Sequence, residues 1–206
     1  MNEEQSTWTL DDSSRASNPG NLDVQYLRWF KSYPMWPLVW FSTLAIFTLL
    51  SIFLHWVFWI PAVLLLVMNL LYWRRVSDHF HHGCANPGVV LSLEPMLIAV
   101  ATDLTMGDGQ YPVIKIIEKK LASICGNPPK VGSIVPTVAL YQPSMKPDQT
   151  HWADFDPRPV DCATSDLGEI KRVIESFTPE DLKELHSWIQ QVPRPYQPGL
   201  YPIEPI

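Results

Sequence analysis

Residues 34–73 read PMWPLVWFSTLAIFTLLSIFLHWVFWIPAVLLLVMNLLYW and contain no Asp, Glu, Lys or Arg. All 15 basic and 21 acidic residues of the 206-residue chain lie outside this run, which excludes a simple soluble globule. As helix, the run would extend about 60 Å at ~1.5 Å per residue, roughly twice the ~30 Å hydrocarbon core of a bilayer. We therefore expect two membrane crossings, at about 36–54 and 57–73, joined by a turn near His55 and Pro61. The alternative is one spanning helix followed by a buried or interfacial segment.

Basic residues flank both ends of this apolar run. Arg28 and Lys31 precede it, and Arg74 and Arg75 follow it directly. Two crossings return the chain to its starting side, and basic residues near span ends mark the cytoplasmic face. The sequence thus predicts a transmembrane hairpin over 21–75 in the plasma (inner) membrane, with both termini in the cytoplasm. The run begins too late and is too long for a signal peptide.

The flanks predict three further parts. Residues 1–20 are rich in Ser, Asn, Asp and Glu and predict a disordered tail. Residues 76–192 are long enough for one compact cytoplasmic domain, and proline recurs through 193–206, which predicts an extended tail. Short apolar runs separated by turn signals predict strands, and a period of 3.6 predicts amphipathic helices. The expected strands are 88–93, 96–104, 112–117, 133–142 and a weak one at 158–163; the expected helices are 167–176 and 179–191.

These elements define an α+β fold class. The number and spacing of the short strands favour a small barrel of the OB or SH3 kind. The two C-terminal helices would pack on this barrel. The whole chain would then be a transmembrane helical hairpin followed by a small β-rich domain.

The best candidate for a metal site follows the hairpin directly. His79, His81, His82 and Cys84 lie close together, and imidazole and thiolate are good ligands for zinc or copper. No second CxxC or HxxxH pair completes a tetrahedron nearby, so His151, Cys125 or Cys162 would have to supply further ligands through folding. The alternative is a polar linker next to the membrane.

Other chemistry has less support. His151, Asp154 and Asp156 could form an acid–base pair, but Asp before Pro more often belongs to a packed turn, with Trp152 and Phe155 plugging the end of the barrel. The chain has no G-x-S-x-G, P-loop or Rossmann glycine pattern, and we expect no cofactor. Its three cysteines fit buried free thiols. A pI near 5.4 argues against nucleic acid as a partner.

Three stretches after the hairpin carry a family resemblance. They are HHGCANPGVV, GSIVPTVALY and HWADFDPRPVDCAT. Their order and spacing resemble an uncharacterised bacterial family of membrane proteins with a cytoplasmic domain of unknown function. The resemblance covers roughly residues 78–192. It implies a bacterial membrane protein and brings no catalytic residue to this chain.

Three functional hypotheses remain at this point. The first is a non-enzymatic protein in which the hairpin anchors a cytoplasmic interaction or scaffold domain. The Pro-rich tail and the loop 143–157 are its expected contact surfaces for a protein partner. The second is a metal-binding or metal-dependent membrane protein that uses the His79–Cys84 cluster. The third is a small channel or transporter formed by homo-oligomerisation.

Overall fold

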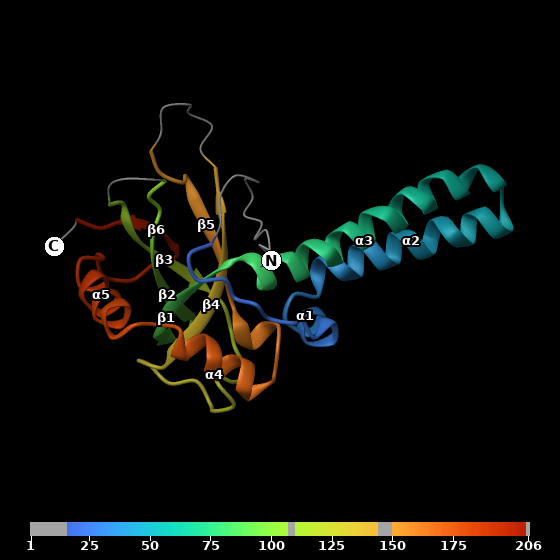
Figure 1. The fold of residues 1–206 in the computed structure, drawn as a ribbon. Helices are drawn as coiled ribbons and strands as arrows, with labels where there is room; N and C mark the ends of the chain where they lie inside the picture. The colour runs from blue at the N-terminus through green and yellow to red at the C-terminus, as the bar shows by residue number, and fades with distance from the viewer. Residues whose placement is uncertain (1–15, 107–109, 144–149, 205–206) are drawn as a thin grey trace, which may run out of the picture.

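The computed structural model describes residues 16–106, 110–143 and 150–204. Most of the predicted N-terminal tail, most of the turn expected at 106–109 and the middle of the loop expected at 143–157 fall outside these residues. The described chain contains five α-helices, two short 3-10 helices and six strands in one sheet (Figure 1). The predicted α+β class is confirmed.

Two long apolar helices project from the rest of the molecule as a hairpin (Figure 1). Helix α2 is Met35–Phe53, and helix α3 is Trp59–His82. Between them lies a short 3-10 helix, η1 (Trp56–Phe58), in which the Val57 amide donates to the ring Nδ1 of His55. By length and composition both helices could cross a membrane, and only 11% of each most apolar window is buried. The hairpin therefore leaves a large apolar surface uncovered.

Helix α3 continues beyond the apolar run that predicts it. The expected end at residue 73 is nine residues short, because α3 extends to His82. Its last turns leave the hairpin and pack on strand β4, where Val76, His79 and Phe80 are buried. Sequence reasoning missed this extension because its exposed face carries charged and polar residues. The consequence is a continuous helical connection between the hairpin and the domain.

The six strands form one antiparallel sheet in the order β5-β4-β1-β2-β3-β6. Apart from a register shift in β1 between Val90 and Ser92, the ladders are regular. The strands are β1 (Cys84–Leu93), β2 (Met96–Asp103), β3 (Pro112–Glu118), β4 (Ile134–Gln142), β5 (Asp154–Pro159) and β6 (Gly199–Pro202).

The sheet is curled but it is not the closed OB or SH3 barrel that the strand spacing suggested. Within the described residues, the ladder ends at β5 on one side and at β6 on the other. Side chains partly bridge the gap, because Lys115 of β3 places its Nζ 2.8 Å from both carboxylate oxygens of Asp154 on β5. A backbone bridge also joins Thr105, which follows β2, to His151, which precedes β5. The predicted weak strand at 158–163 is instead β5, which ends where the 3-10 helix η2 (Val160–Cys162) begins.

Both faces of the central strands are buried. On β2, Leu97, Ala99 and Ala101 belong to one apolar cluster, and Ile98 and Val100 belong to the other. The first cluster is completed by Leu185, Ile189 and Val192, so helix α5 covers that face. The second is completed by helix α4, by the end of α3 and by helix α1. Burial on both faces explains why β2 is almost continuously apolar.

The three smaller helices are α1 (Tyr26–Ser32), α4 (Leu167–Glu175) and α5 (Pro179–Ile189). The last two begin at the residues expected from the 3.6-residue period, and they end one and two residues earlier than expected. Asp166 caps α4, and Thr178 with Asp181 forms a capping box at α5, which satisfies amides that a helix start leaves unpaired. Helix α1 was not predicted, since seven residues give too short a periodic signal.

Two predicted tails are partly ordered. Asn18, Pro19, Gly20 and Leu22 make backbone contacts with residues 80–85. At Gly20 a Cβ would lie 2.5 Å from the carbonyl oxygen of Phe80, so only glycine permits this approach. In the Pro-rich C-terminal stretch, Gly199–Pro202 pairs with β3 as strand β6. Both segments were predicted as tails because composition does not reveal such edge pairing.

A buried carboxyl group on η2 predicts a pH-dependent stability. Asp161 accepts the Cys125 amide at 3.0 Å through Oδ1, while its buried Oδ2 has no partner among the described residues. Burial raises the pKa of Asp161 to about 6, above the ~3.9 of an unfolded chain. The stability that Asp161 contributes is therefore complete below about pH 4 and is lost as the pH rises through about 6.

We expect Asp161→Asn to remove this pH dependence. Relative to Asp161→Asn, the wild type should lose up to about 3 kcal/mol of stability between pH 4 and pH 7, at ~1.36 kcal/mol per pKa unit. The measurement is thermal unfolding in mild detergent between pH 4 and pH 7, with the exposed Asp23→Asn as control. An Asp161→Asn protein that keeps the wild-type slope would contradict this assignment.

Candidate functional site

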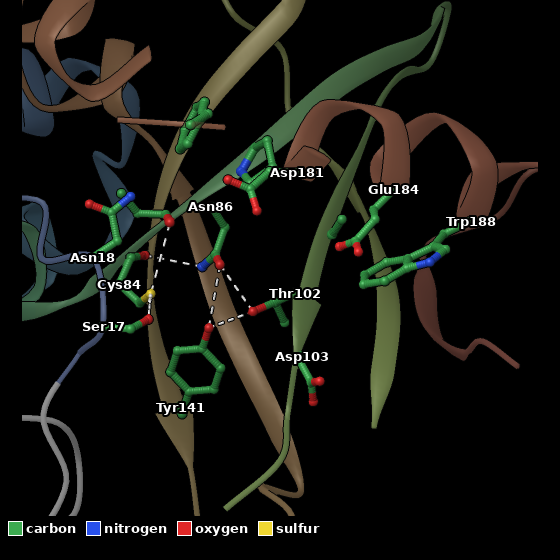
Figure 2. A pocket seen from close by; sticks show the side chains of 14 residues that line it. Ser17, Asn18, Cys84, Asn86, Thr102, Asp103, Tyr141, Asp181, Glu184 and Trp188 are labelled. Carbon is green, nitrogen blue, oxygen red and sulfur yellow. Dashed lines mark hydrogen bonds between the residues drawn. The ribbon is translucent and has the colours of Figure 1, made fainter. Parts of the chain in front are cut away.

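The main candidate site is a cavity of about 390 Å³ between the N-terminal segment, the start of β1, the end of β2 and helix α5 (Figure 2). A neighbouring cavity of about 400 Å³ shares four of its lining residues. These four are Asp103, Asp181, Glu184 and Trp188, and we call them the acidic groove. Cavities of this size are typical of binding sites.

Hydrogen-bonded polar side chains line the inner wall of the cavity. Thr102 Oγ1 donates to Asn86 Oδ1 at 3.0 Å and lies 2.5 Å from the Tyr141 hydroxyl. Asn86 Nδ2 donates to the Cys84 carbonyl oxygen at 3.1 Å, and its backbone carbonyl accepts from Thr137 at 2.9 Å. Figure 2 shows the side chains of Asn86, Thr102 and Tyr141 meeting on this wall. The network holds them in fixed orientations.

This wall is not arranged for acid–base or nucleophilic chemistry. Burial raises the pKa of the Tyr141 hydroxyl well above its usual value of 10, so Tyr141 remains protonated near neutral pH. The Cys84 thiol is 3.9 Å from Ser17 Oγ and 3.8 Å from the Ala85 carbonyl oxygen. Within the described residues, no histidine nitrogen lies within hydrogen-bond reach of the thiol, as an activated nucleophile requires.

Hydrogen bonds fix two of the three carboxylates of the acidic groove in place. Asp103 Oδ1 accepts the amides of Thr105 at 2.8 Å and Tyr111 at 2.9 Å. Asp181 Oδ2 accepts the Thr178 amide at 2.7 Å. The described residues provide no hydrogen bond to the second oxygen of either group, nor to Glu184. The groove therefore offers preoriented acceptors to a ligand that carries donors or positive charge.

Helical spacing explains how α5 contributes to the groove. Asp181, Glu184 and Trp188 lie at i, i+3 and i+7, which places them on one face of the helix. In Figure 2 their side chains lie along α5 at the edge of the cavity. The sequence contained this signal, but the helix was predicted from its apolar face alone. Asp103 comes from a strand end, and its position beside α5 depends on the tertiary fold.

The predicted metal residues lie at the junction of α3 and β1 but serve separate contacts. His79 is buried, and its Nε2 lies 2.9 Å from the Val138 carbonyl oxygen. The rings of His81 and His82 pack edge to face against each other, and Cys84 lines the main cavity. Across the described ranges, no three His, Cys, Asp or Glu side chains are placed to hold a metal ion. The structure therefore gives the metal hypothesis no support.

The residues considered for an acid–base pair, His151, Asp154 and Asp156, are also divided among separate contacts. His151 stacks on Tyr111 with ring centroids 3.7 Å apart. Asp154 pairs with Lys115, and Asp156 pairs with Arg158 at 2.7 Å. The segment expected as a packed loop is mainly strand β5, and Trp152 and Phe155 are buried as anticipated.

The three cysteines are free thiols. Cys84 and Cys162 are buried, and Cys125 is half-buried. Burial raises the pKa of Cys125 to about 11 and raises that of Cys162 above its usual value. Since the thiolate is the reactive form, neither of these two residues is poised for nucleophilic chemistry near neutral pH.

The fold and the groove define an α+β domain, built on a curled antiparallel sheet, that carries an apolar helical hairpin. The comparison with protein families matches residues 74–192 to the family described as "Protein of unknown function (DUF3239)". The chain belongs to this family, which confirms the expected membership of an uncharacterised family.

The comparison with solved structures finds a chain described as a "putative membrane protein from Corynebacterium diphtheriae". The two chains are 21% identical, and the match covers 58% of this chain and 99% of the other, with a TM-score of 0.46. The comparison with curated proteins gives no match.

Proposed function

We propose that the protein is a membrane-anchored interaction module. Helices α2 and α3 cross the bilayer as a hairpin, and the domain lies in the cytoplasm together with both termini. Its acidic groove binds a Lys- or Arg-bearing segment of a partner protein. The observation that carries this proposal is the groove itself, which combines three carboxylates with an aromatic side chain beside a cavity of about 390 Å³.

The exposed surface of the hairpin supports the anchor. Large apolar side chains along both helices remain about half exposed or more, including Ile46 at 55%, Phe53 at 82% and Leu64 at 61%. At roughly 25 cal/mol per Å² of apolar surface, exposing such helices to water is strongly unfavourable. A lipid bilayer removes this cost, and the closed hydrogen bonding of a helix makes the segment compatible with lipid.

Charge complementarity supports the basic partner segment. The described residues that line the two cavities carry three carboxylates, from Asp103, Asp181 and Glu184, and one ammonium group, from Lys183. A cationic side chain would form charge-assisted hydrogen bonds with the open carboxylate oxygens. Its aliphatic part or guanidinium plane could pack on the indole of Trp188.

The test is peptide binding to the full chain in mild detergent. The probe is a fluorescent peptide of alternating Lys and Ser, and a peptide of alternating Glu and Ser is the charge control. We expect binding of the Lys peptide only, and an affinity about threefold weaker for Glu184→Gln, since one partly exposed charge contact contributes roughly 0.2–1 kcal/mol. Raising the salt concentration should weaken the binding further.

Glu180→Gln is the matched control. Glu180 lies on the same helix, carries the same charge and does not line either cavity. It should leave the affinity unchanged. Equal losses of affinity in Glu180→Gln and Glu184→Gln would mean that peptide binding depends only on the net charge of the protein. The groove would then be rejected as the site. Equal binding of the Glu peptide would reject it as well.

A further inference from the structure

A third cavity, of about 240 Å³, lies where the hairpin meets the domain. Residues from α1, the start of α2, the domain end of α3 and strands β4 and β5 line it. A cavity of about 440 Å³ beside it shares Tyr33, Trp36, Asp156 and Arg158. Neither cavity shares a residue with the acidic groove. The junction therefore forms a separate candidate site.

The position of this junction along α3 coincides with the end of the apolar run. Tyr72, Arg75, Val76 and His79 all line the 240 Å³ cavity, and their spacing of i, i+3, i+4 and i+7 places them on one face of the helix. The last residue of the uncharged run is Trp73. If α3 crosses a bilayer, as the proposed function requires, Arg75 lies about half a turn beyond the end of the apolar run, at the depth of the headgroups.

Two arginines face this cavity with unused hydrogen-bonding capacity. Arg75 is exposed and forms no hydrogen bond or ion pair with any described residue, in contrast to its neighbour Arg74, which lies 3.8 Å from Asp78. Arg158 donates from Nε at 3.0 Å and from Nη2 at 2.7 Å to a single oxygen, Asp156 Oδ2. Its guanidinium has five N–H donors, so further donors remain for a ligand.

Aromatic side chains pack against Arg158, and a further one, Tyr72, adds a hydroxyl donor to the cavity. The guanidinium of Arg158 lies 5.2 Å from the ring centre of Trp29 and 4.9 Å from that of Tyr33, which fixes its plane by cation–π contact. Trp29 Nε1 donates to the Tyr72 hydroxyl at 2.9 Å. The Tyr72 hydroxyl thus acts as an acceptor there, and its own proton has no acceptor among the described residues.

We propose that this junction binds the phosphate of an anionic lipid headgroup. Arg75, Arg158 and the Tyr72 hydroxyl supply the donors, and Trp36 lies at the rim where the lipid glycerol region would be. Guanidinium groups match phosphate geometry with paired hydrogen bonds. The two arginines outweigh the single negative charge of Asp156 in the 240 Å³ cavity, so an anion restores the local charge balance. This proposal rests on membrane insertion of the hairpin.

The test is thermal unfolding of the purified full chain in a neutral detergent. The added probes are dioctanoyl phosphatidylglycerol, dioctanoyl phosphatidylcholine and inorganic phosphate. We expect the phosphatidylglycerol probe to raise the Tm in a saturable manner, at a concentration at least threefold lower than phosphatidylcholine. Arg75→Gln should shift the phosphatidylglycerol curve to at least threefold higher concentration. Arg74→Gln removes the same charge one residue away and should leave the curve in place.

The probes distinguish a lipid headgroup from free phosphate as the source of the anion. If inorganic phosphate stabilises the chain as well as phosphatidylglycerol does, the site binds free phosphate and the headgroup assignment is overturned. Equal effects of the two lipids, or equal shifts in Arg74→Gln and Arg75→Gln, overturn the site itself. Alkaline carbonate extraction of native membranes reports hairpin insertion separately, so a failed anchor is distinguished from a failed headgroup site.

Discussion

Ile46→Arg and Leu66→Arg together should release the protein from the membrane fraction. The two residues lie on α2 and α3 at similar distances from the turn, and their side chains are 55% and 47% exposed. A charge at the centre of a spanning helix costs about 2.5–3.5 kcal/mol on insertion scales. The pair should therefore cost about 5–7 kcal/mol and shift the insertion equilibrium by at least about a thousandfold, at ~1.4 kcal/mol per factor of ten.

The measurement for this double variant is the membrane-bound share after carbonate extraction. Val131→Arg with Leu167→Arg is the matched control, since it adds two charges at exposed apolar positions of the domain, 63% and 58% exposed. The control should remain with the membrane as the wild type does. A hairpin variant that also stays fully membrane-bound would contradict the insertion of α2 and α3.

Among the single substitutions, Phe80→Ala should lower the free energy of unfolding the most. Phe80 is fully buried at the domain end of α3, with its ring centre 5.5 Å from that of Trp29, and its carbonyl accepts the Leu22 amide. Removing a buried phenyl ring costs about 3–5 kcal/mol through lost transfer energy and the cavity left behind. For a domain of this size the Tm should fall by more than about 10 °C.

Two controls separate this effect from a general sensitivity of the chain. Phe80→Leu keeps most of the apolar volume and should show less than half of the loss in Tm. Val131→Ala removes an exposed side chain and should change the Tm by no more than a few degrees. A Phe80→Ala protein that unfolds at the temperature of the wild type would contradict the buried contact between the hairpin and the domain.

The sequence predicted the elements whose signals are local. An uncharged run of forty residues led to two long apolar helices, and the 3.6-residue period led to α4 and α5 within a few residues of their ends. Short apolar runs bounded by turn signals placed β2, β3 and β4 within one residue of their ends. Each of these signals lies within one element and depends little on the rest of the fold.

The parts that sequence reasoning missed depend on contacts between distant residues. The extension of α3 to His82 is buried only because β4 lies beside it. Strand β6 exists because β3 offers it an edge, and the sheet stays open because β5 and β6 remain unpaired with each other within the described chain.

The candidate site was missed for the same reason. Asp103 and Glu184 are 81 residues apart and meet only after α5 packs on the sheet. The cluster His79–Cys84 attracted attention because its members are neighbours in the sequence. A helix end followed by a strand, however, turns such neighbours toward different surroundings, and His79 is used to contact Val138.

The most direct test of the whole account is the accessibility of single cysteines in intact cells. In a chain with Cys84, Cys125 and Cys162 replaced, one new cysteine is placed at Leu54 in the turn of the hairpin, or at Val131 in the domain; both positions are exposed. A membrane-impermeant thiol reagent added outside should label Leu54→Cys and leave Val131→Cys unlabelled until the cells are opened. Labelling of Val131→Cys from outside, or protection of Leu54→Cys, would contradict a hairpin that crosses the membrane twice and returns the domain to the cytoplasm.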